Sequence, residues 1–156
     1  MPETIVIADT SCLIALASAE VLDILPRLYS RIVITESIRD EYMGELPSWI
    51  EVSAVSDPKY QRVLERILDK GEASAIALAV SLKNVEDVLL ILDDLKARKE
   101  AKGLGFKVTG TLGILFRARQ DGLIPALKPY TDKLQSTGFR ISTIVIGELL
   151  ALSNEL

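Results

Sequence analysis

Residues 88–92 read Val-Leu-Leu-Ile-Leu, an unbroken apolar run that is followed directly by two aspartates, Asp93 and Asp94. A strand that is apolar on both faces is typical of the centre of a parallel sheet, where helices cover each side. Other short β-branched runs alternate along the chain with longer segments of helical spacing. This alternation predicts an α/β fold with a mostly parallel sheet.

Five strands and a series of connecting helices are expected from the hydrophobic spacing. The strands are expected at Ile5–Ala8, Arg31–Thr35, Ile50–Val55, Val88–Leu92 and Phe106–Thr109. The helices are expected after Thr10, at Val21–Tyr29, Glu36–Met43, after Asp57-Pro58, and at Ala73–Leu82, Leu95–Lys102, Thr111–Gln120, Pro125–Ser136 and Ser142–Leu152. The helix after Pro58 is expected to stop at Asp69-Lys70-Gly71.

Length and composition exclude several kinds of chemistry. The 156 residues suit one domain, so we expect residues 1–156 to fold as a unit. Eighteen basic and 22 acidic residues leave a net charge of −4, and any nucleic-acid binding must therefore be local or pass through a metal ion. The chain has no histidine and one cysteine, which excludes Ser-His-Asp catalysis and His-ligated zinc. Any catalytic or binding chemistry must therefore come from carboxylates, hydroxyls, lysines and arginines.

The apolar segments do not predict a membrane protein. The first residues lack the basic segment of a secretory signal peptide, and the apolar stretch at 141–152 is too short to span a bilayer and contains Glu148. We therefore expect a soluble, cytoplasmic protein without a membrane partner.

Acidic side chains follow two of the expected strands directly: Asp9 follows the first, and Asp93 and Asp94 follow the fourth. The crevice of a parallel α/β sheet lies beyond the carboxyl ends of its strands, so these acids are expected at one edge. Glu72, at the start of a buried helix, and Glu41, on the helix after the second strand, are expected to lie toward the same rim.

Carboxylates gathered in this way repel one another, and a divalent cation relieves that repulsion. Oxygen ligands and retained waters are what Mg²⁺ or Mn²⁺ prefers. Such a cation can activate a water for attack on a phosphodiester and stabilise the leaving oxygen. It would also let an acidic protein handle RNA.

Each acid also has a purely structural explanation. Asp9 is suited to cap a helix, and the Asp93-Asp94 pair is suited to cap the helix that begins at Leu95. Glu72 is placed to complement a helix dipole, and Glu41 is placed on a solvated helix face. The metal hypothesis depends on all of them occurring in this order on this pattern of elements.

Four segments resemble the motifs of PIN domains, over about Ile5 to Gly122. They are Ile-Ala-Asp-Thr-Ser-Cys-Leu-Ile at 7–14, Gly-Glu-Ala-Ser-Ala-Ile-Ala-Leu-Ala at 71–79, Leu-Ile-Leu-Asp-Asp-Leu-Lys-Ala-Arg at 90–98 and Val-Thr-Gly-Thr-Leu-Gly-Ile-Leu at 108–115. The third resembles the Asp-Asp-x-x-Ala-Arg form, and the fourth the Thr-Gly-Thr segment of a VapC-like branch. The resemblance implies a three-layer α/β/α fold with a parallel sheet of about five strands.

The resemblance also implies a metal-dependent ribonuclease, of a family in which many members are toxins of toxin–antitoxin pairs. By position, Asp9, Glu72 and Asp94 match the metal carboxylates, with Asp93 as a fourth or supporting acid. The family's helix acid matches Glu41 best, although Asp40 and Glu36 stay open. Ser11 resembles a hydroxyl near the metal water, and Thr109 a position that often faces the site.

Basic residues and the C-terminal helices supply possible binding surfaces. Lys96, Arg98 and Lys99 lie beside Asp94, either on a solvated helix face or as contacts to RNA phosphates. The helices from about residue 123 would cover the site or form an interaction segment. The expected partners are RNA, a small antitoxin protein and a second copy of the chain in a homodimer.

The sequence thus favours an endoribonuclease that hydrolyses RNA with Mg²⁺ or Mn²⁺ and serves as the toxin of a toxin–antitoxin pair. One alternative is a PIN-like binding or scaffold subunit without catalysis. Another is a nuclease of RNA maturation without toxicity.

Overall fold

The computed structural model describes residues 4–82 and 87–156. Five strands form one sheet in the order β3-β2-β1-β4-β5, and every neighbouring pair is parallel. The strands are β1 (Ile5–Ala8), β2 (Arg31–Thr35), β3 (Ile50–Ser53), β4 (Val88–Ile91) and β5 (Lys107–Thr109). The predicted parallel sheet is confirmed, with each strand within two residues of its expected bounds.

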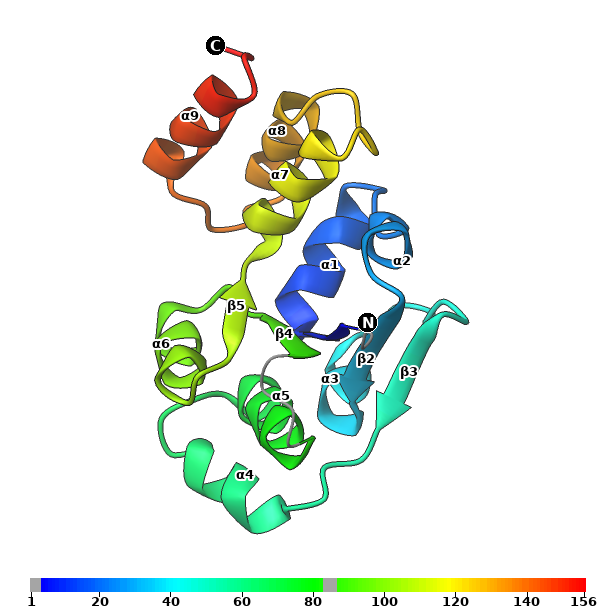
Figure 1. The fold of residues 1–156 in the computed structure, drawn as a ribbon, viewed down its shortest axis with the longest axis vertical. Helices are drawn as coiled ribbons and strands as arrows, with labels where there is room; N and C mark the ends of the chain where they lie inside the picture. The colour runs from blue at the N-terminus through cyan, green and yellow to red at the C-terminus, as the bar shows by residue number, and fades with distance from the viewer. Residues whose placement is uncertain (1–3, 83–86) are drawn as a thin grey trace.

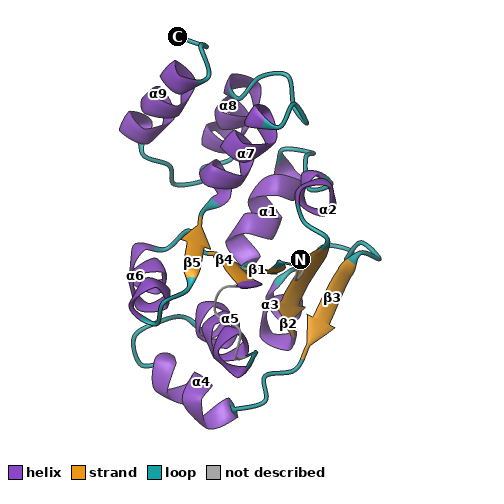
Figure 2. Ribbon diagram, viewed as in Figure 1, coloured by secondary structure: helices purple, strands orange, loops and turns teal. Residues whose placement is uncertain are grey.

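Helices cover both sides of this sheet, which confirms the three-layer α/β/α fold (Figure 1). On one side α5 contacts β1, β2 and β4, and α1 lies on the other side and contacts α7 (Figure 2). The helices are α1 (Thr10–Ser18), α2 (Ile24–Leu28), α3 (Glu36–Glu41), α4 (Pro58–Leu64), α5 (Lys70–Ser81), α6 (Leu95–Gly103), α7 (Thr111–Gln120), α8 (Lys128–Ser136) and α9 (Thr143–Leu152).

The two central strands explain the apolar run from which the fold was predicted. Val6, Ile7 and Ala8 on β1 are fully buried, as are Leu90 and Ile91 on β4. Helices on both faces remove each of these side chains from water, so successive residues are apolar rather than alternating.

The register of the sheet places the strand ends side by side. Ala8 pairs with Ile91, and the backbone N–H of Asp9 donates to the carbonyl of Ile91 at 3.1 Å. The backbone N–H of Leu92, the residue after β4, donates to the carbonyl of Thr109 at 2.9 Å. The chain segments that leave β1, β4 and β5 therefore start from one edge of the sheet.

Some helices begin or end elsewhere than predicted. The helix after Pro58 does not stop at Asp69-Lys70-Gly71 as expected: α4 already ends at Leu64, Asp69 caps α5 by accepting from the backbone N–H of Glu72 at 2.8 Å, and Gly71 lies in the first turn of α5. The helix expected at Val21–Tyr29 is shortened to α2, and the one expected from Pro125 starts at Lys128. An aspartate N-cap outweighs a nearby glycine because it satisfies an otherwise unpaired backbone donor.

The C-terminal helices pack onto the layer that contains α1 and α7. Leu134, Ile146 and Leu150 are buried, so α8 and α9 contribute to the core. The same α9 leaves Ile144 73 % and Leu152 69 % exposed, so it also presents apolar surface. Across residues 4–82 and 87–156, no helix combines the length and apolarity needed to cross a membrane.

Candidate active site

Asp9 lies directly after β1 and caps α1. Its Oδ1 accepts from the backbone N–H of Cys12 at 2.9 Å, and its Oδ2 lies 3.4 Å from the backbone N of Asp93. The side chain is only 4 % exposed. The capping role expected of Asp9 is therefore real, but one carboxylate oxygen also faces the end of β4.

Asp93 is joined to Asp9 through Ser11. The hydroxyl of Ser11 lies 3.1 Å from Oδ2 of Asp93 and 3.4 Å from each carboxylate oxygen of Asp9. Asp93 is held from the other side by Thr111, whose backbone N–H and hydroxyl each donate to it at 2.7 Å. Asp93 thus substitutes for a side-chain cap at the start of α7, where Gly110 offers none.

Glu72 lies in the first turn of α5, and Asp94 at the start of α6. Asp94 caps α6 by accepting from the backbone N–H of Ala97 at 3.1 Å. Asp69, Asp94 and Asp9 are all close enough to Glu72 to act on its ionisation. Both expected structural roles, the Glu72 position in a first turn and the Asp94 cap, are present alongside this clustering.

Glu41 is the acid of α3 that lies in one hollow with Asp9 and Glu72. Its Oε2 accepts from the hydroxyl of Thr10 at 3.2 Å. By contrast, Asp40 is 70 % exposed and pairs with its neighbour Arg39, and Glu36 is exposed at the start of the helix. The hollow has a volume of about 250 Å³ and is lined by Asp9, Thr10, Ser11, Ile14, Glu41, Asp69, Gly71 and Glu72.

The backbone of α5 supports Glu41. A Cβ on Gly71 would lie 2.7 Å from Oε1 of Glu41, so only glycine allows this close approach. Ser74 donates to the carbonyl of Gly71 at 2.7 Å and shares a 2.6 Å hydrogen bond with Thr35 at the end of β2. This buried pair ties the first turn of α5 to the edge of the sheet.

Burial and crowding raise the pKa of two of these carboxyls. Desolvation by burial, and then the charge of Asp93, raise the pKa of Asp9 from 3.8 to about 7. Desolvation raises the pKa of Glu72 from 4.5 to about 9, with a hydrogen bond and the charge of Asp69 adding to it. Negative charge is therefore costly here, which is the electrostatic condition that a bound cation relieves.

The side chains of Asp9, Thr10, Ser11, Glu41, Asp69 and Glu72 line the hollow with carboxylate and hydroxyl oxygens, the ligands that suit Mg²⁺ or Mn²⁺. Asp9 and Asp93 share one hydroxyl, and Glu72 and Glu41 line the hollow that contains Asp9. Within the described part of the chain, no three acidic or cysteine side chains are close enough together to hold an ion as they stand. The donor chemistry fits, and closing of the carboxylates around an ion would complete the set.

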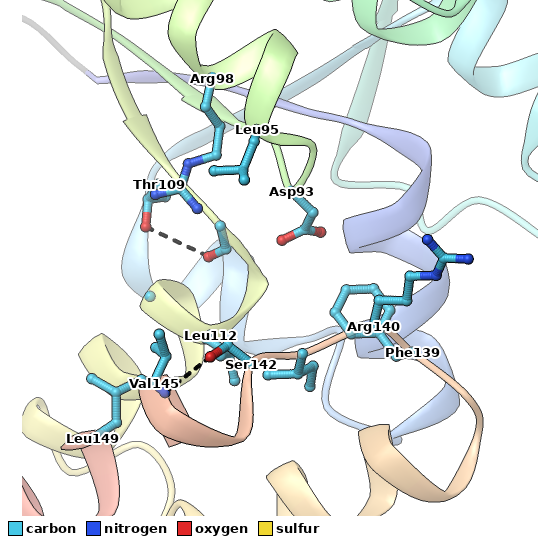
Figure 3. A pocket seen from close by; sticks show the side chains of 13 residues that line it. Asp93, Leu95, Arg98, Thr109, Leu112, Phe139, Arg140, Ser142, Val145 and Leu149 are labelled. Atoms are coloured by element: carbon cyan, nitrogen blue, oxygen red, sulfur yellow. Dashed lines mark hydrogen bonds between the residues drawn. The ribbon is translucent and has the colours of Figure 1, made fainter. Parts of the chain in front are cut away.

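The remaining predicted site residues lie on another pocket or on the surface. Arg98 and Thr109 line a pocket of about 510 Å³ together with Asp93 (Figure 3). The hydroxyl of Thr109 is 3.5 Å from the carbonyl of Gly110. Lys96 and Lys99 are exposed on α6. Of the three predicted basic contacts, the structure thus brings Arg98 beside a candidate carboxylate.

Sequence reasoning did not single out Thr111, Asp69 or the Thr35–Ser74 pair. Thr111 was visible as the last residue of Thr-Gly-Thr, a hydroxyl at a helix start, which is a position that commonly binds an acceptor. Asp69 was hidden because a glycine follows two residues later and suggested a helix end. Thr35 and Ser74 carry no local signal, since their bond joins segments 39 residues apart.

The fold and these side chains define an α/β protein with an acidic site at the carboxyl edge of a parallel sheet. A family model described as PIN domain matches residues 5–155, so the chain belongs to the PIN-domain family. Members of this family are generally nucleases and generally use divalent metals. No curated protein and no solved structure matches the chain significantly.

Proposed function

We propose that the protein is an endoribonuclease that requires Mg²⁺ or Mn²⁺ and hydrolyses phosphodiester bonds of RNA. The observation that carries the proposal is the Ser11 hydroxyl, which lies between the carboxylates of Asp9 and Asp93. It brings together acids that are 84 residues apart in sequence, at the edge where α/β proteins bind their ligands.

Asp9, Glu72 and Asp94 would hold the metal, with Asp93 and Glu41 as further acids. A bound divalent cation would supply positive charge against the phosphate and activate a water. Ser11 holds Asp9 and Asp93 in one arrangement through its hydroxyl. Thr111 restrains Asp93 through two donors, so this carboxylate is oriented before any ligand arrives.

The same motifs support a place in the VapC-like branch, as the cytoplasmic toxin of a toxin–antitoxin pair. A small antitoxin would restrain the enzyme by covering the acidic hollow. The exposed apolar side chains of α9, Ile144 and Leu152, offer surface to a partner or to a second copy in a homodimer. We extend this interaction role to the C-terminal helices from about residue 123.

Metal binding and RNA cleavage, measured on the same samples, test the proposal. Wild-type protein is titrated with Mn²⁺ in a calorimeter, beside Asp9→Asn, Glu72→Gln and a matched control, Asp40→Asn. We expect Mn²⁺ affinity and cleavage rate to fall more than about 100-fold in the first two variants. Even substitution of a residue that only hydrogen-bonds to a metal ligand lowers metal affinity or activity about 10- to 100-fold. The exposed Asp40 is expected to be dispensable.

Two results would contradict the proposal. Equal cleavage by Asp9→Asn and wild type would remove Asp9 from the reaction. Wild-type protein that binds no Mn²⁺ and cleaves no RNA would favour the scaffold alternative.

Expression in cells separates the two nuclease hypotheses. Growth arrest that disappears in Asp9→Asn supports a toxin. Harmless expression of a protein that cleaves RNA in vitro supports a role in RNA maturation.

A further inference from the structure

A pocket of about 510 Å³ opens beside Asp93 (Figure 3). Through the hydroxyl of Ser11, Asp93 is linked to Asp9, which lines the acidic hollow. The walls of the pocket are the first turns of α6 and α7, the end of β5, the first two turns of α9 and the connection between α8 and α9. Its lining residues are Asp93, Leu95, Arg98, Thr109, Gly110, Leu112, Gly113, Phe139, Arg140, Ile141, Ser142, Val145 and Leu149. The pocket therefore contains one candidate catalytic carboxylate, that of Asp93. None of its lining residues also lines the acidic hollow.

The connection at 137–142 is held at both ends. Gly138 adopts a φ of 82°, which ends α8 and lets the backbone N–H of Phe139 bond the carbonyl of Leu134 at 3.2 Å. Ser142 caps α9 by accepting from the backbone N–H of Val145 at 3.3 Å. Phe139 and Arg140 are thus presented to the pocket by two helix ends rather than by a free loop.

Positive charge gathers here although the whole chain carries a net charge of −4. In Figure 3, Asp93 lies between Arg98, from α6, and Arg140, from the connection. Neither guanidinium forms an ion pair with any residue of 4–82 or 87–156. Both charges are available to an anionic ligand, and the start of α9, which the neutral hydroxyl of Ser142 caps, adds to the positive potential.

Apart from the hydroxyls of Thr109 and Ser142, the other side chains that line the pocket are apolar. Leu95, Leu112 and Val145 line it together with the half-buried ring of Phe139. Small-molecule pockets of about 300–1,000 Å³ with apolar walls and a few convergent polar groups are the usual setting for a ligand of nucleotide size. An aromatic ring beside unpaired guanidinium groups suits a base attached to phosphates.

We propose that this pocket, hereafter the nucleoside pocket, binds one nucleoside of single-stranded RNA next to the phosphate that is cleaved. The base stacks on Phe139, and Arg98 and Arg140 contact the phosphates on either side of the nucleoside. The inference rests on the proposed function for the position of the cleaved bond, because Asp93 lines the pocket and is also one of the acids of the proposed active site. A single strand is required, since a base paired in a helix cannot enter a pocket.

Binding of a six-nucleotide RNA in EDTA, where metal-dependent cleavage is blocked, tests the pocket alone. Phe139→Ala is expected to weaken binding about 5- to 100-fold, the range for loss of one stacked base, while Phe139→Tyr keeps the affinity of wild type. Arg98→Gln and Arg140→Gln are each expected to lower the slope of log affinity against log salt by about 0.7. Tyr60→Ala and Arg62→Gln on α4 are the matched controls.

A fluorescent variant reports contact with the base directly. Trp49 is the one tryptophan of the chain and precedes β3, at the opposite edge of the sheet from β5. Phe139→Trp therefore places a second indole in the nucleoside pocket against a constant background. We expect RNA to quench the added emission and polyphosphate, which has no base, to leave it unchanged.

Cleavage in Mn²⁺ separates failure of the nucleoside pocket from failure of the proposed function. If Phe139→Ala and Arg98→Gln cleave RNA with the KM and kcat of wild type, the pocket is not a nucleoside site, although the nuclease stands. If wild type cleaves nothing but RNA quenches Phe139→Trp, the nucleoside pocket stands and the nuclease fails. Absence of quenching, together with unchanged affinity in Phe139→Ala, would overturn the inference and leave the pocket to a protein partner.

Discussion

At the scale of single residues, the site depends on hydroxyl groups that hold carboxylates. Ser11 lies between Asp9 and Asp93, Thr111 holds Asp93, and Thr10 donates to Glu41. Each hydroxyl is close in sequence to a strand end. Such bonds orient charged groups that would otherwise move apart, so their loss should affect ion binding as well as stability.

The raised pKa of Asp9 predicts how stability changes with pH in metal-free protein. The unfolded chain loses this proton near the ordinary value of 3.8, but the folded protein keeps it up to about 7. Folded protein then binds more protons than unfolded protein, so the free energy of unfolding falls as pH rises between these values. Glu72, with a pKa of about 9, extends the fall to higher pH.

Urea unfolding of metal-free wild type and Asp9→Asn from pH 5 to pH 8 measures this effect. Asparagine does not ionise, so the variant is expected to lose less stability over the range and to be the more stable protein at pH 8. Saturating Mn²⁺ should flatten the wild-type dependence, because metal binding displaces the protons. A difference between the two proteins that does not change with pH would contradict the assigned pKa.

Thr111→Val tests the hydroxyl that holds Asp93. Valine matches threonine in shape but removes the 2.7 Å bond to Oδ2 at a fully buried position. We expect the free energy of unfolding to fall by about 1.5–3 kcal/mol, the usual range for a hydrogen bond to a charged group. Mn²⁺ affinity should fall about 10- to 100-fold.

Thr111→Ser is the control for that measurement, because it keeps the hydroxyl and loses one methyl group. It should bind Mn²⁺ as wild type does. Wild-type affinity in Thr111→Val itself would mean that the backbone donor of residue 111 is sufficient to place Asp93.

At the scale of secondary structure, α5 positions the acidic hollow. Its N-cap Asp69 sets where the helix begins, which puts Glu72 in the first turn and Gly71 against the carboxylate of Glu41. The start of one helix thus controls two candidate ligands on different elements.

Gly71→Ala separates helix stability from site geometry. Alanine usually stabilises a helix relative to glycine by up to about 1 kcal/mol, so we expect the variant to fold at least nearly as stably as wild type. Its methyl group would lie 2.7 Å from Oε1 of Glu41 and push that flexible side chain away. Mn²⁺ affinity and RNA cleavage should therefore fall while the unfolding midpoint does not.

Gly147→Ala is the matched control for that change. Gly147 lies within α9, and a Cβ added there would have nothing within 4 Å beyond its two chain neighbours and the nearby backbone of α9 itself. Both variants should gain helix propensity, and only Gly71→Ala should lose ion binding. Equal ion binding in the two would show that Glu41 is not part of the metal site.

At the scale of the whole molecule, the end of the chain fastens the C-terminal helices. The carboxylate of Glu155 accepts from the backbone N–H groups of Leu127 and Lys128 at 2.8–2.9 Å, at the start of α8. Arg119 of α7 lies 3.8 Å from the same carboxylate. One side chain that follows α9 therefore joins α7, α8 and α9.

Glu155→Gln is expected to lower the free energy of unfolding by about 1.5–3 kcal/mol, because it removes the charge that two backbone donors and Arg119 face. Urea unfolding at pH 7 measures the change. The control is Asp132→Asn, which breaks an exposed pair with Lys128 and should cost less than about 0.5 kcal/mol. Similar losses in the two variants would remove Glu155 from this role.

Most of the fold could be predicted because its signals are local. The apolar run at 88–92 and the β-branched runs at 5–8 and 31–35 each predict a strand from their own residues, without knowledge of their neighbours in the sheet. Asp9 and Asp93 could be predicted as neighbours because parallel strands end at one edge. The bounds of α2 and α5 could not, since caps and turns compete there over a few residues.

The sequence by itself determined the order of the elements, the parallel sheet and the acids that follow its strands, because periodicity and strand ends are properties of short segments. Only the tertiary structure decided that Glu41, rather than Asp40 or Glu36, reaches the acidic hollow, and that Phe139 and Arg140 lie beside Asp93. These contacts join residues about 30 to 50 positions apart, and their partners are set by packing between elements, which no local pattern records.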